Sequence, residues 1–404
     1  MLRKRETKST AMKFVILLGG VSLFADMTYE GARSINGPYL ALFGTSAAVV
    51  GFVAGFGELI GYALRLLSGY ISDKTGRYWA IMIGGYVINL LAVPFLALAG
   101  HWPMAVALMI AERAGKAIRN PARDAMLSHA THEMGHGWGF GLHEAMDQIG
   151  AMLGPLIVAA ILYFRGSYRL GYAVLLIPAL LAFAVLFAAR LLYPRPHDLE
   201  INIPSFKTRK FSRVYWLYLL GVCLIAAGYA DFPLIAYHFE KVSTVPKVWV
   251  PVFYSIAMGT DALAALICGW LFDRFGLAIV AGITMLSLFF APFVFLGGFA
   301  AALIGMILWG VGMGSQESIL RAVIASVVPP EKRGTAFGIF NAAYGLSWFL
   351  GSLALGFLYG ISLPLLVLCS MGLQLAAVPL VLFCRRHLNK HASVEKLNLQ
   401  DMSE

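Results

Sequence analysis

The chain has 404 residues, of which 59% are hydrophobic and 13% charged, and its formal net charge is +10. A soluble protein would carry about 25% charged residues, so this composition excludes an ordinary soluble domain. The basic residues gather before the first apolar run, near the middle of the chain and after the last run. Loops rich in lysine and arginine stay in the cytoplasm, so the positive charge predicts membrane topology and argues against a nucleic-acid partner.

Apolar runs of about 20 residues, the length that spans a bilayer, recur along the whole chain. They predict an all-α polytopic membrane protein with 12 transmembrane helices. The predicted spans cover residues 13–43, 47–71, 78–99, 103–127, 136–163, 169–192, 214–240, 249–271, 276–297, 300–326, 335–359 and 362–384. We interpret the first run as an uncleaved span rather than a signal peptide, because no small-residue cleavage site follows it.

A polar, proline-containing segment divides the spans into two sets of six. The predicted organisation is an N-terminal six-helix bundle (1–192), a cytoplasmic linker (193–213), a C-terminal six-helix bundle (214–384) and a cytoplasmic tail (385–404). An even number of spans places both termini on the same side, and their basic residues predict that this side is the cytoplasm; we expect the protein in the cell (inner) membrane.

The two halves repeat each other. GYISDKTG (69–76) resembles GWLFDRFG (269–276), and GWGFGLHEAMDQIGAMLG (137–154) resembles GTAFGIFNAAYGLSWFLG (334–351), at nearly the same offset. Duplication of a six-helix unit predicts two pseudo-symmetric bundles. In many transporters such bundles rock against each other around a central site.

Three segments carry a family resemblance. GYISDKTGR (69–77), PPEKRGTAFG (329–338) and GAMLGP (150–155) resemble elements of the major facilitator superfamily, the last of them from its antiporter branch. The resemblance implies the major facilitator fold, transport by alternating access and a cytoplasmic gate. In the gate, Asp73 would lie near the start of the eleventh span and Arg77 would pair with Asp124. The residues of the predicted gate are Gly69, Asp73, Gly76, Arg77, Asp124, Asp273 and Arg333.

Ionisable residues inside the predicted spans form a second group of candidates. Such residues are costly in a membrane, and they face a bundle interior or a water-filled cavity. We predict that they couple protons or line the substrate cavity; structural ion pairs between helices are the alternative. The candidates are Asp26, Glu30, Arg33, Glu58, Glu112, Arg113, Lys116, His143, Glu144, Asp147, Asp231 and Asp261.

The first span carries Asp26, Glu30 and Arg33 on one helical face. Arg33 would neutralise Glu30 and leave Asp26 deepest. Burial of an isolated carboxyl favours its neutral form, which suits Asp26 to carrying a proton.

The fifth span places His143 and Asp147 one turn apart. The pair could bind a proton, form a structural hydrogen bond, or ligate a divalent cation with help from another helix. Because two ligands are too few for a metal ion, no metal site is predicted. The next turns hold Gly150, Gly154 and Pro155, which indicate either a pliant helix that seals an interface or ordinary close packing.

The fourth span concentrates charge in one stripe, formed by Glu112, Lys116, Arg119 and Arg123. The spacing predicts a pair between Glu112 and Lys116. Arg119 and Arg123 would extend to water at the cytoplasmic interface. Pro121 would end or kink the helix.

No nucleotide-binding loop, metalloprotease motif or serine-hydrolase motif is present, so we expect neither an enzyme nor a cofactor. We expect a functional monomer that uses the proton gradient to export a small organic molecule: a drug-like compound, a siderophore-like compound or a metabolite. The alternative is a facilitator or symport importer of a metabolite or metal cation.

Overall fold

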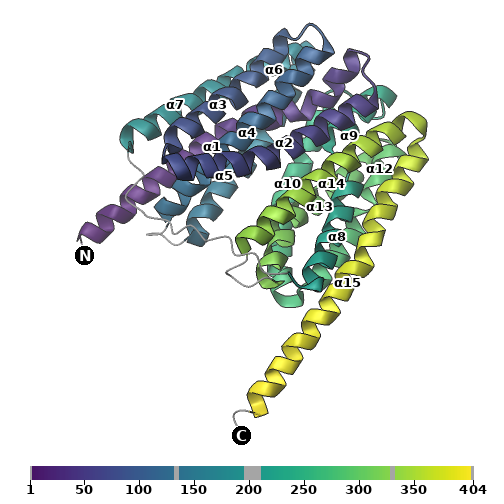
Figure 1. Ribbon diagram of the computed structural model, residues 1–404. Coiled ribbons are helices and arrows are strands. Elements are labelled where there is room, and N and C mark those ends of the chain that lie inside the picture. Colours follow the sequence, from purple (N-terminus) through teal and green to yellow (C-terminus); the bar gives the residue numbers. More distant parts are fainter. Residues whose placement is uncertain (1, 132–135, 195–210, 328–332, 402–404) are drawn as a thin grey trace. The chain divides into compact units, whose positions relative to one another are not determined.

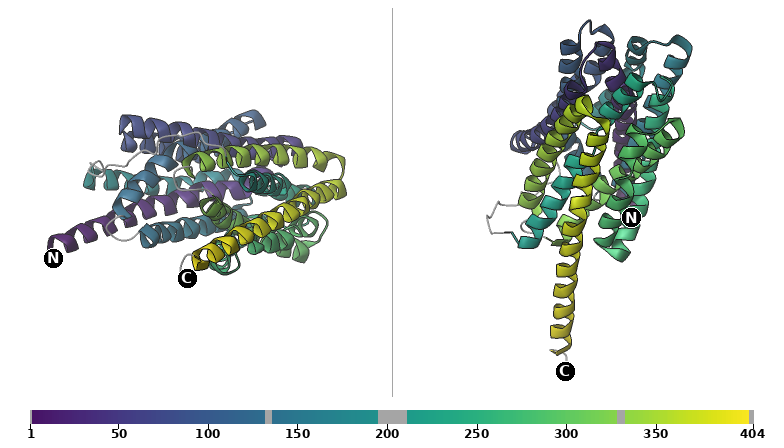
Figure 2. Two further views of the ribbon diagram at one scale, coloured as in Figure 1. Left: turned by 60° about the horizontal axis from the view of Figure 1, so that its bottom comes forward. Right: turned by 90° about the vertical axis from the view of Figure 1, so that its right-hand side faces the viewer.

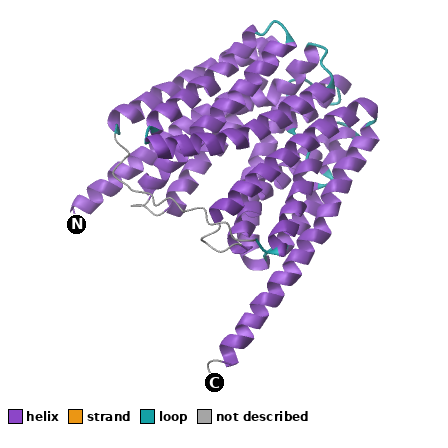
Figure 3. Cartoon of the chain, in the orientation of Figure 1, coloured by secondary structure: helices purple, strands orange, loops and turns teal. Residues whose placement is uncertain are grey.

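The structure, a computed structural model, describes residues 2–131, 136–194, 211–327 and 333–401. All regular elements in these ranges are helices (Figures 1 and 3). In chain order they are α1 (Leu2–Leu42), α2 (Ala47–Thr75), α3 (Tyr78–Phe95), the short 3₁₀ helix η1 (Leu96–Leu98), α4 (Trp102–Thr131), α5 (His136–Arg165), α6 (Tyr168–Val174), α7 (Leu176–Leu192), α8 (Arg213–Gly228), α9 (Phe232–Val242), α10 (Trp249–Phe275), α11 (Ala278–Ser287), α12 (Phe290–Phe295), α13 (Phe299–Val327), α14 (Arg333–Ile361) and α15 (Leu363–Asp401). The predicted all-α class is confirmed.

The number of membrane spans also agrees with the prediction. In the described part of the chain, 11 helical segments are long and apolar enough to cross a membrane. The remaining predicted span is α4, whose concentration of charged side chains separates it from the apolar segments. With α4 included, the helices match the 12-helix fold that the sequence predicts.

The seventh predicted span, 214–240, consists of two helices, α8 and α9, rather than one. Pro233 lies in the first turn of α9, where its missing N–H is not needed, and Asp231 caps that helix. The carbonyl of Gly228, at the end of α8, accepts a hydrogen bond from Ser370 Oγ at 2.6 Å. Side-chain donors of α15 therefore satisfy the end of α8 at the break.

The fourth span has no break at the position where one was predicted. Helix α4 continues through Pro121 to Thr131. A proline inside a membrane helix is tolerated where neighbouring groups compensate for the lost backbone bond. The Pro121 ring packs against Gly69 of α2, 3.5 Å from the position of an added Cβ atom. The predicted end of this helix at Pro121 is wrong.

Contacts group the chain into two compact units. Unit 1 comprises Met1–Asn202 with Asp231–Gly259, and unit 2 comprises Ile203–Ala230 with Thr260–Glu404. Contacts thus assign α9 and the first part of α10 to unit 1, and the domain boundaries expected from the sequence stay a prediction. The reason for this assignment is close packing on α1, where the backbone of Pro233 contacts Gly37 and Tyr237 donates a hydrogen bond to the Thr45 carbonyl at 2.9 Å.

Within unit 1, α1 packs against α5, α7 and α9, while α4 packs against α2 and α3. Gly115 and Gly85 bring α4 and α3 into backbone contact, which places the charged stripe of α4 in the interior. Within unit 2, α8 packs against α14 and α15. The C-terminal end of α15 extends beyond the other helices of this unit (Figure 2).

Candidate functional site

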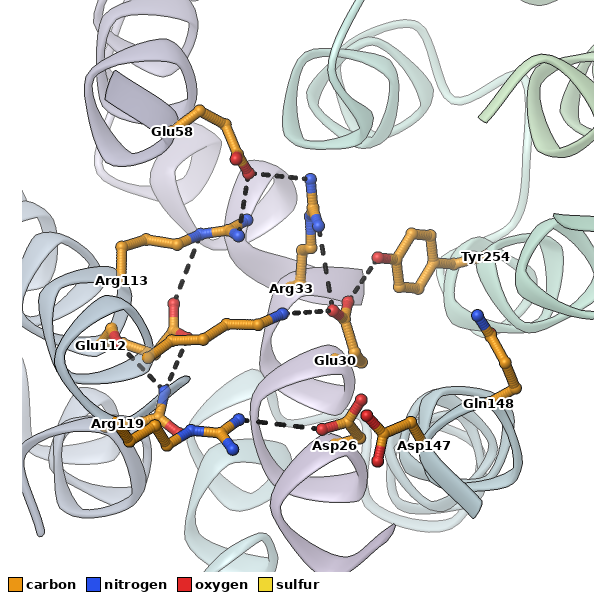
Figure 4. Close-up of polar contacts among 12 residues, drawn as sticks. Asp26, Glu30, Arg33, Glu58, Glu112, Arg113, Arg119, Asp147, Gln148 and Tyr254 are labelled. Carbon is orange, nitrogen blue, oxygen red and sulfur yellow. Dashed lines mark hydrogen bonds and ion pairs between the residues drawn. The ribbon is translucent and has the colours of Figure 1, made fainter. Parts of the chain in front are cut away.

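The polar side chains of α1 and α4 meet in the interior of unit 1 (Figure 4). Both helices carry charges at helical spacing, so each presents a charged stripe to the other. Further partners come from α2, α5, α9 and α10. We call this set the unit 1 network; its carboxyl groups belong to Asp26, Glu30, Glu58, Glu112, Asp147 and Asp231, and its cations to Arg33, Arg113, Lys116, Arg119 and Arg123.

Arg33 of α1 is surrounded by carboxylates from three helices. Its guanidinium nitrogens lie 2.9 Å from Asp231 Oδ1, 3.6 Å from Glu58 Oε1 and 3.9 Å from Glu30 Oε1. The shortest of these pairs is nearly sealed, because the Asp231 side chain is only 1% exposed. Asp231 also accepts a hydrogen bond from the Phe232 amide, so one side chain starts α9 and joins it to α1.

Glu30, also on α1, is held by two other helices. Tyr254 of α10 donates a hydrogen bond to Glu30 Oε2 at 2.5 Å, and Lys116 Nζ of α4 lies 3.6 Å from Oε1. The Lys116 ammonium also lies 3.9 Å from the ring centroid of Tyr29, a cation–π contact. Lys116 therefore pairs with α1, and the predicted pair between Glu112 and Lys116 is replaced by a contact between helices.

Glu112 has partners of its own. Asn89 of α3 donates through Nδ2 to Glu112 Oε1 at 2.9 Å and to the Glu112 carbonyl at 3.0 Å. Arg113 bridges Glu112, at 3.5 Å, and Glu58 of α2, at 2.9 Å. The two hydrogen bonds and the two ion pairs tie α2, α3 and α4 together around the network.

Arg119 is completely buried, which contradicts the prediction that it extends to water at the interface. It donates a hydrogen bond to Tyr86 Oη at 2.9 Å, and its guanidinium lies 4.4 Å from the centroid of the Tyr86 ring. Its Nη2 atom is 3.9 Å from Asp26 Oδ1. The close packing of α3 on α4 explains the error, since it covers the face of α4 that the sequence places at the membrane surface.

A second cluster joins α4 to α5. Arg123 lies 3.5 Å from Asp147 Oδ2, and His143 Nδ1 lies 3.6 Å from Asp147 Oδ1. The other ring nitrogen of His143 is 3.0 Å from Ser22 Oγ of α1. Arg123 is thus mostly buried and pairs inside unit 1, so its predicted position in water is also wrong.

Two candidates lie apart from this network. Glu144 is exposed and accepts a hydrogen bond from Gln148 of the same helix at 3.4 Å. Asp261 is buried in unit 2, where it lies against Gly314 of α13. Among the described residues, no group of three or more histidine, cysteine, aspartate or glutamate side chains could hold a metal ion.

The sequence model of the Major Facilitator Superfamily matches residues 18–352, with a second, overlapping match over residues 249–397. The chain belongs to this family. The resemblance of the three short motifs is therefore confirmed at the scale of the whole chain.

Relatives support the family over most of the chain. An uncharacterised protein of Mycobacterium tuberculosis is 40% identical over 383 residues, which are 93% of this chain and 94% of the relative. Multidrug resistance protein MdtH of Photorhabdus laumondii is 28% identical over 330 residues, 80% of each chain. The crystal structure of nucleoside transporter NupG has a TM-score of 0.72 at 14% identity, covering 92% of this chain and 98% of that one, and shares the fold.

The family's signature loop follows α2. Gly76 has a φ of 63° and donates its N–H to the Ser72 carbonyl at 2.8 Å, so it ends α2 in a conformation that favours glycine. Gly276, its counterpart in the second half, has a φ of 58° and makes the equivalent bond to Phe272. The repeat seen in the sequence is therefore a repeat of backbone geometry.

The partners of the predicted gate residues differ from expectation within unit 1. Asp73 accepts a hydrogen bond from Tyr78 at 3.1 Å, and Asp124 pairs with Arg123 at 2.9 Å rather than with Arg77. Asp273 and Arg333 lie outside the residues whose side chains the structure describes. The contact of Asp73 with the start of the eleventh span stays a prediction.

The glycines of the fifth span lie where α5 crosses α1. A Cβ atom on Gly150 would meet the Leu23 carbonyl, and one on Gly154 would meet the Met27 carbonyl. Pro155 lies inside α5, which continues to Arg165. Both glycines thus permit direct backbone contact between two helices that carry network residues.

Sequence reasoning missed several neutral partners: Asn89, Tyr86, Tyr29 and Ser22. Asn89 had a visible signal, because it is the single side-chain amide in the apolar run of α3. The tyrosines and the serine had none, since such residues are common in spans and only the contact with a buried charge distinguishes them.

Proposed function

We propose that this chain is a proton-coupled secondary active transporter that exports a small organic molecule by alternating access. The observation that carries the proposal is the buried unit 1 network, in which Glu30 is held at once by Lys116 of α4 and Tyr254 of α10. Charges are retained inside a membrane at a cost in stability, so a connected set of them favours a functional explanation over packing alone.

The network can respond to both a proton and a charged ligand. Lys116 of α4 and Tyr254 of α10 both contact the Glu30 carboxylate of α1, so a change of charge elsewhere in the network alters how these three helices are joined. A proton bound at one helix would therefore change which helices are joined. This is the coupling that an exchanger of protons for substrate needs.

Export is supported by the likeness to a protein named for multidrug resistance and by the antiporter-like motif on α5. A drug-like compound, a siderophore-like compound and a metabolite all remain candidate cargoes. The facilitator and the symport importer are the competing functions, and they differ from the proposal in how transport depends on the proton gradient.

Proteoliposomes containing the purified chain test the proposal. A substrate panel is offered under an imposed pH gradient, with a pH dye inside the vesicles. Antiport predicts uphill substrate accumulation with proton movement in the opposite direction, and its loss when a protonophore collapses the gradient. Proton movement in the same direction would identify a symporter, and equilibration that ignores the gradient would identify a facilitator; both outcomes contradict the proposal.

Glu30→Gln provides the variant, and Glu240→Gln the matched control, because Glu240 is a carboxylate outside the network that accepts a hydrogen bond from Tyr168. We expect Glu30→Gln to lower proton-driven accumulation by about tenfold or more, since about 1.4 kcal/mol of lost interaction is a factor of ten. Glu240→Gln should transport like the unmodified chain. Equal losses in both variants would contradict a special role for the network.

We also propose that both termini are cytoplasmic. The support is the basic character of the N-terminal segment, the central linker and the C-terminal tail. Cysteine labelling of intact cells with a membrane-impermeant reagent tests this orientation, and labelling at either terminus would contradict it.

A further inference from the structure

Two aspartates face each other where α1 crosses α5. A Cβ atom on Gly150 would lie 3.0 Å from Asp26 Cβ, and His143, two turns earlier on α5, contacts Ser22 of α1. Asp147 lies on the same face of α5 between these two contacts, so its carboxyl group points toward that of Asp26 (Figure 4). The two side chains are 9% and 14% exposed.

One carboxyl oxygen of each aspartate lacks a hydrogen bond in the described structure. The Oδ1 atoms of Asp26 and Asp147 are both buried without a hydrogen bond, and so are Nε and Nη2 of the fully buried Arg119. Arg119 donates a hydrogen bond to Tyr86, and Arg123 donates hydrogen bonds to Ser22 and Asp124. The cations balance the charge of the aspartates at 3.9 and 3.5 Å without donating to the two Oδ1 atoms.

The carboxyl groups of the unit 1 network differ in how many cations lie close to them. Glu30 and Glu58 each have two cations within 4.0 Å. Asp26 and Asp147 instead face each other, and two ionised carboxylates at such a site repel.

The groups around the pair belong to all three helices that pack there. Tyr29 and Glu30 are on α1, His143 and Glu144 on α5, and Lys116, Arg119 and Arg123 on α4. The α4 cations stabilise a pair that carries charge. They do not remove the repulsion between two ionised carboxylates, and a shared proton does.

We propose that Asp26 and Asp147 share a single proton across the crossing of α1 and α5, as the proton-binding site of the transporter. This inference rests on the proposed proton coupling and assigns it to one pair. The proton sits between the two carboxyl groups as an O–H···O hydrogen bond, and the pair then carries one negative charge. When the proton leaves, both groups are ionised, and Asp26 can turn to the unused Nε and Nη2 of Arg119.

Infrared difference spectra of the purified full chain, taken between acidic and alkaline pH without substrate or gradient, test the site directly. The expected signal is the carbonyl stretch of a protonated carboxyl group that disappears as pH rises. Because both aspartates are needed to share the proton, Asp26→Asn and Asp147→Asn should each abolish or shift this band. The double variant should lose no more signal than either single variant. Glu240→Gln, which lies outside the network, should leave the band unchanged.

A band that survives both single variants, or two losses that add in the double variant, would overturn the shared site. If Asp26→Asn does not fold, as judged by size-exclusion chromatography, Asp147→Asn decides the question alone. The two proposals can fail independently. If the carboxyl band is normal but the chain shows no gradient-driven transport, the proton site stands and proton-coupled transport is refuted. Proton-driven transport with no protonated carboxyl band refutes the site and keeps the function.

Discussion

The interiors of the two units are held together by different chemistry. In unit 1, helices are joined by ion pairs such as Arg33 with Asp231 and Arg113 with Glu58. Among the described contacts of unit 2, neutral side chains donate to backbone carbonyls, as where Trp309 donates to Ala230 and Tyr218 to Leu320, both at 2.9 Å. Yet the two halves share the backbone geometry of Gly76 and Gly276. The two halves therefore share this turn geometry, while the ion pairs described above lie in unit 1.

The largest expected effect is at the most deeply buried ion pair. Asp231→Asn keeps a residue that caps α9 well but removes the charge opposite Arg33. Asp231 makes the shortest contact to Arg33, and the remaining carboxylates, at 3.6 and 3.9 Å, compensate only part of the buried charge, so we expect a loss of about 3 kcal/mol in the free energy of unfolding. Denaturant unfolding of the purified protein measures it, and a loss as small as that of a surface pair would mean that ion pairs do not hold unit 1 together.

The next effect is steric and should appear in both units alike. Gly150→Ala in unit 1 and Gly351→Ala in unit 2 each force a Cβ atom into the backbone of a neighbouring helix. We expect each to cost about 1–3 kcal/mol, the usual penalty for overpacking. Gly84→Ala and Gly360→Ala, where nothing lies within 4 Å, serve as controls in the same unfolding assay. A neutral result at Gly150 or Gly351 would refute the close crossing there.

Neutral contacts in unit 2 should individually have a smaller effect. Ser370→Ala removes the hydroxyl that donates to the Gly228 carbonyl at the break between α8 and α9. The loss should be about 1 kcal/mol, the net contribution of a hydrogen bond, and Gln374 still donates to the same carbonyl at 3.3 Å. Denaturant unfolding of Ser370→Ala and Asp231→Asn side by side compares the neutral hydrogen bond with the ion pair. An equal loss of stability in the two variants would contradict the stronger role of ion pairs in unit 1.

The smallest effect is expected at an exposed ion pair of unit 1. Asp124 is 52% exposed, and Arg123 has a second carboxylate partner in Asp147. Asp124→Asn should therefore change the free energy of unfolding by no more than about 1 kcal/mol. A larger loss would show that burial is not what separates strong from weak pairs in this unit.

The number of spans, the internal repeat and the helical faces that carry charge could all be predicted from the sequence. These features follow from local properties: apolar length, glycine at a left-handed turn, and the period of 3.6 residues that puts His143 and Asp147 together. Helical spacing states which residues share a face. It does not state which helix covers that face or how deeply.

The partners of the charged side chains depend on how the helices pack against one another. Lys116 pairs with Glu30 instead of Glu112 because α1 lies opposite α4, and Arg119 is buried because Gly85 and Gly115 let α3 pack directly on α4. The break before Asp231 likewise depends on donors from α15, more than a hundred residues away. Long charged side chains reach whichever opposite charge the packing brings near, and the crossing of helices sets that distance.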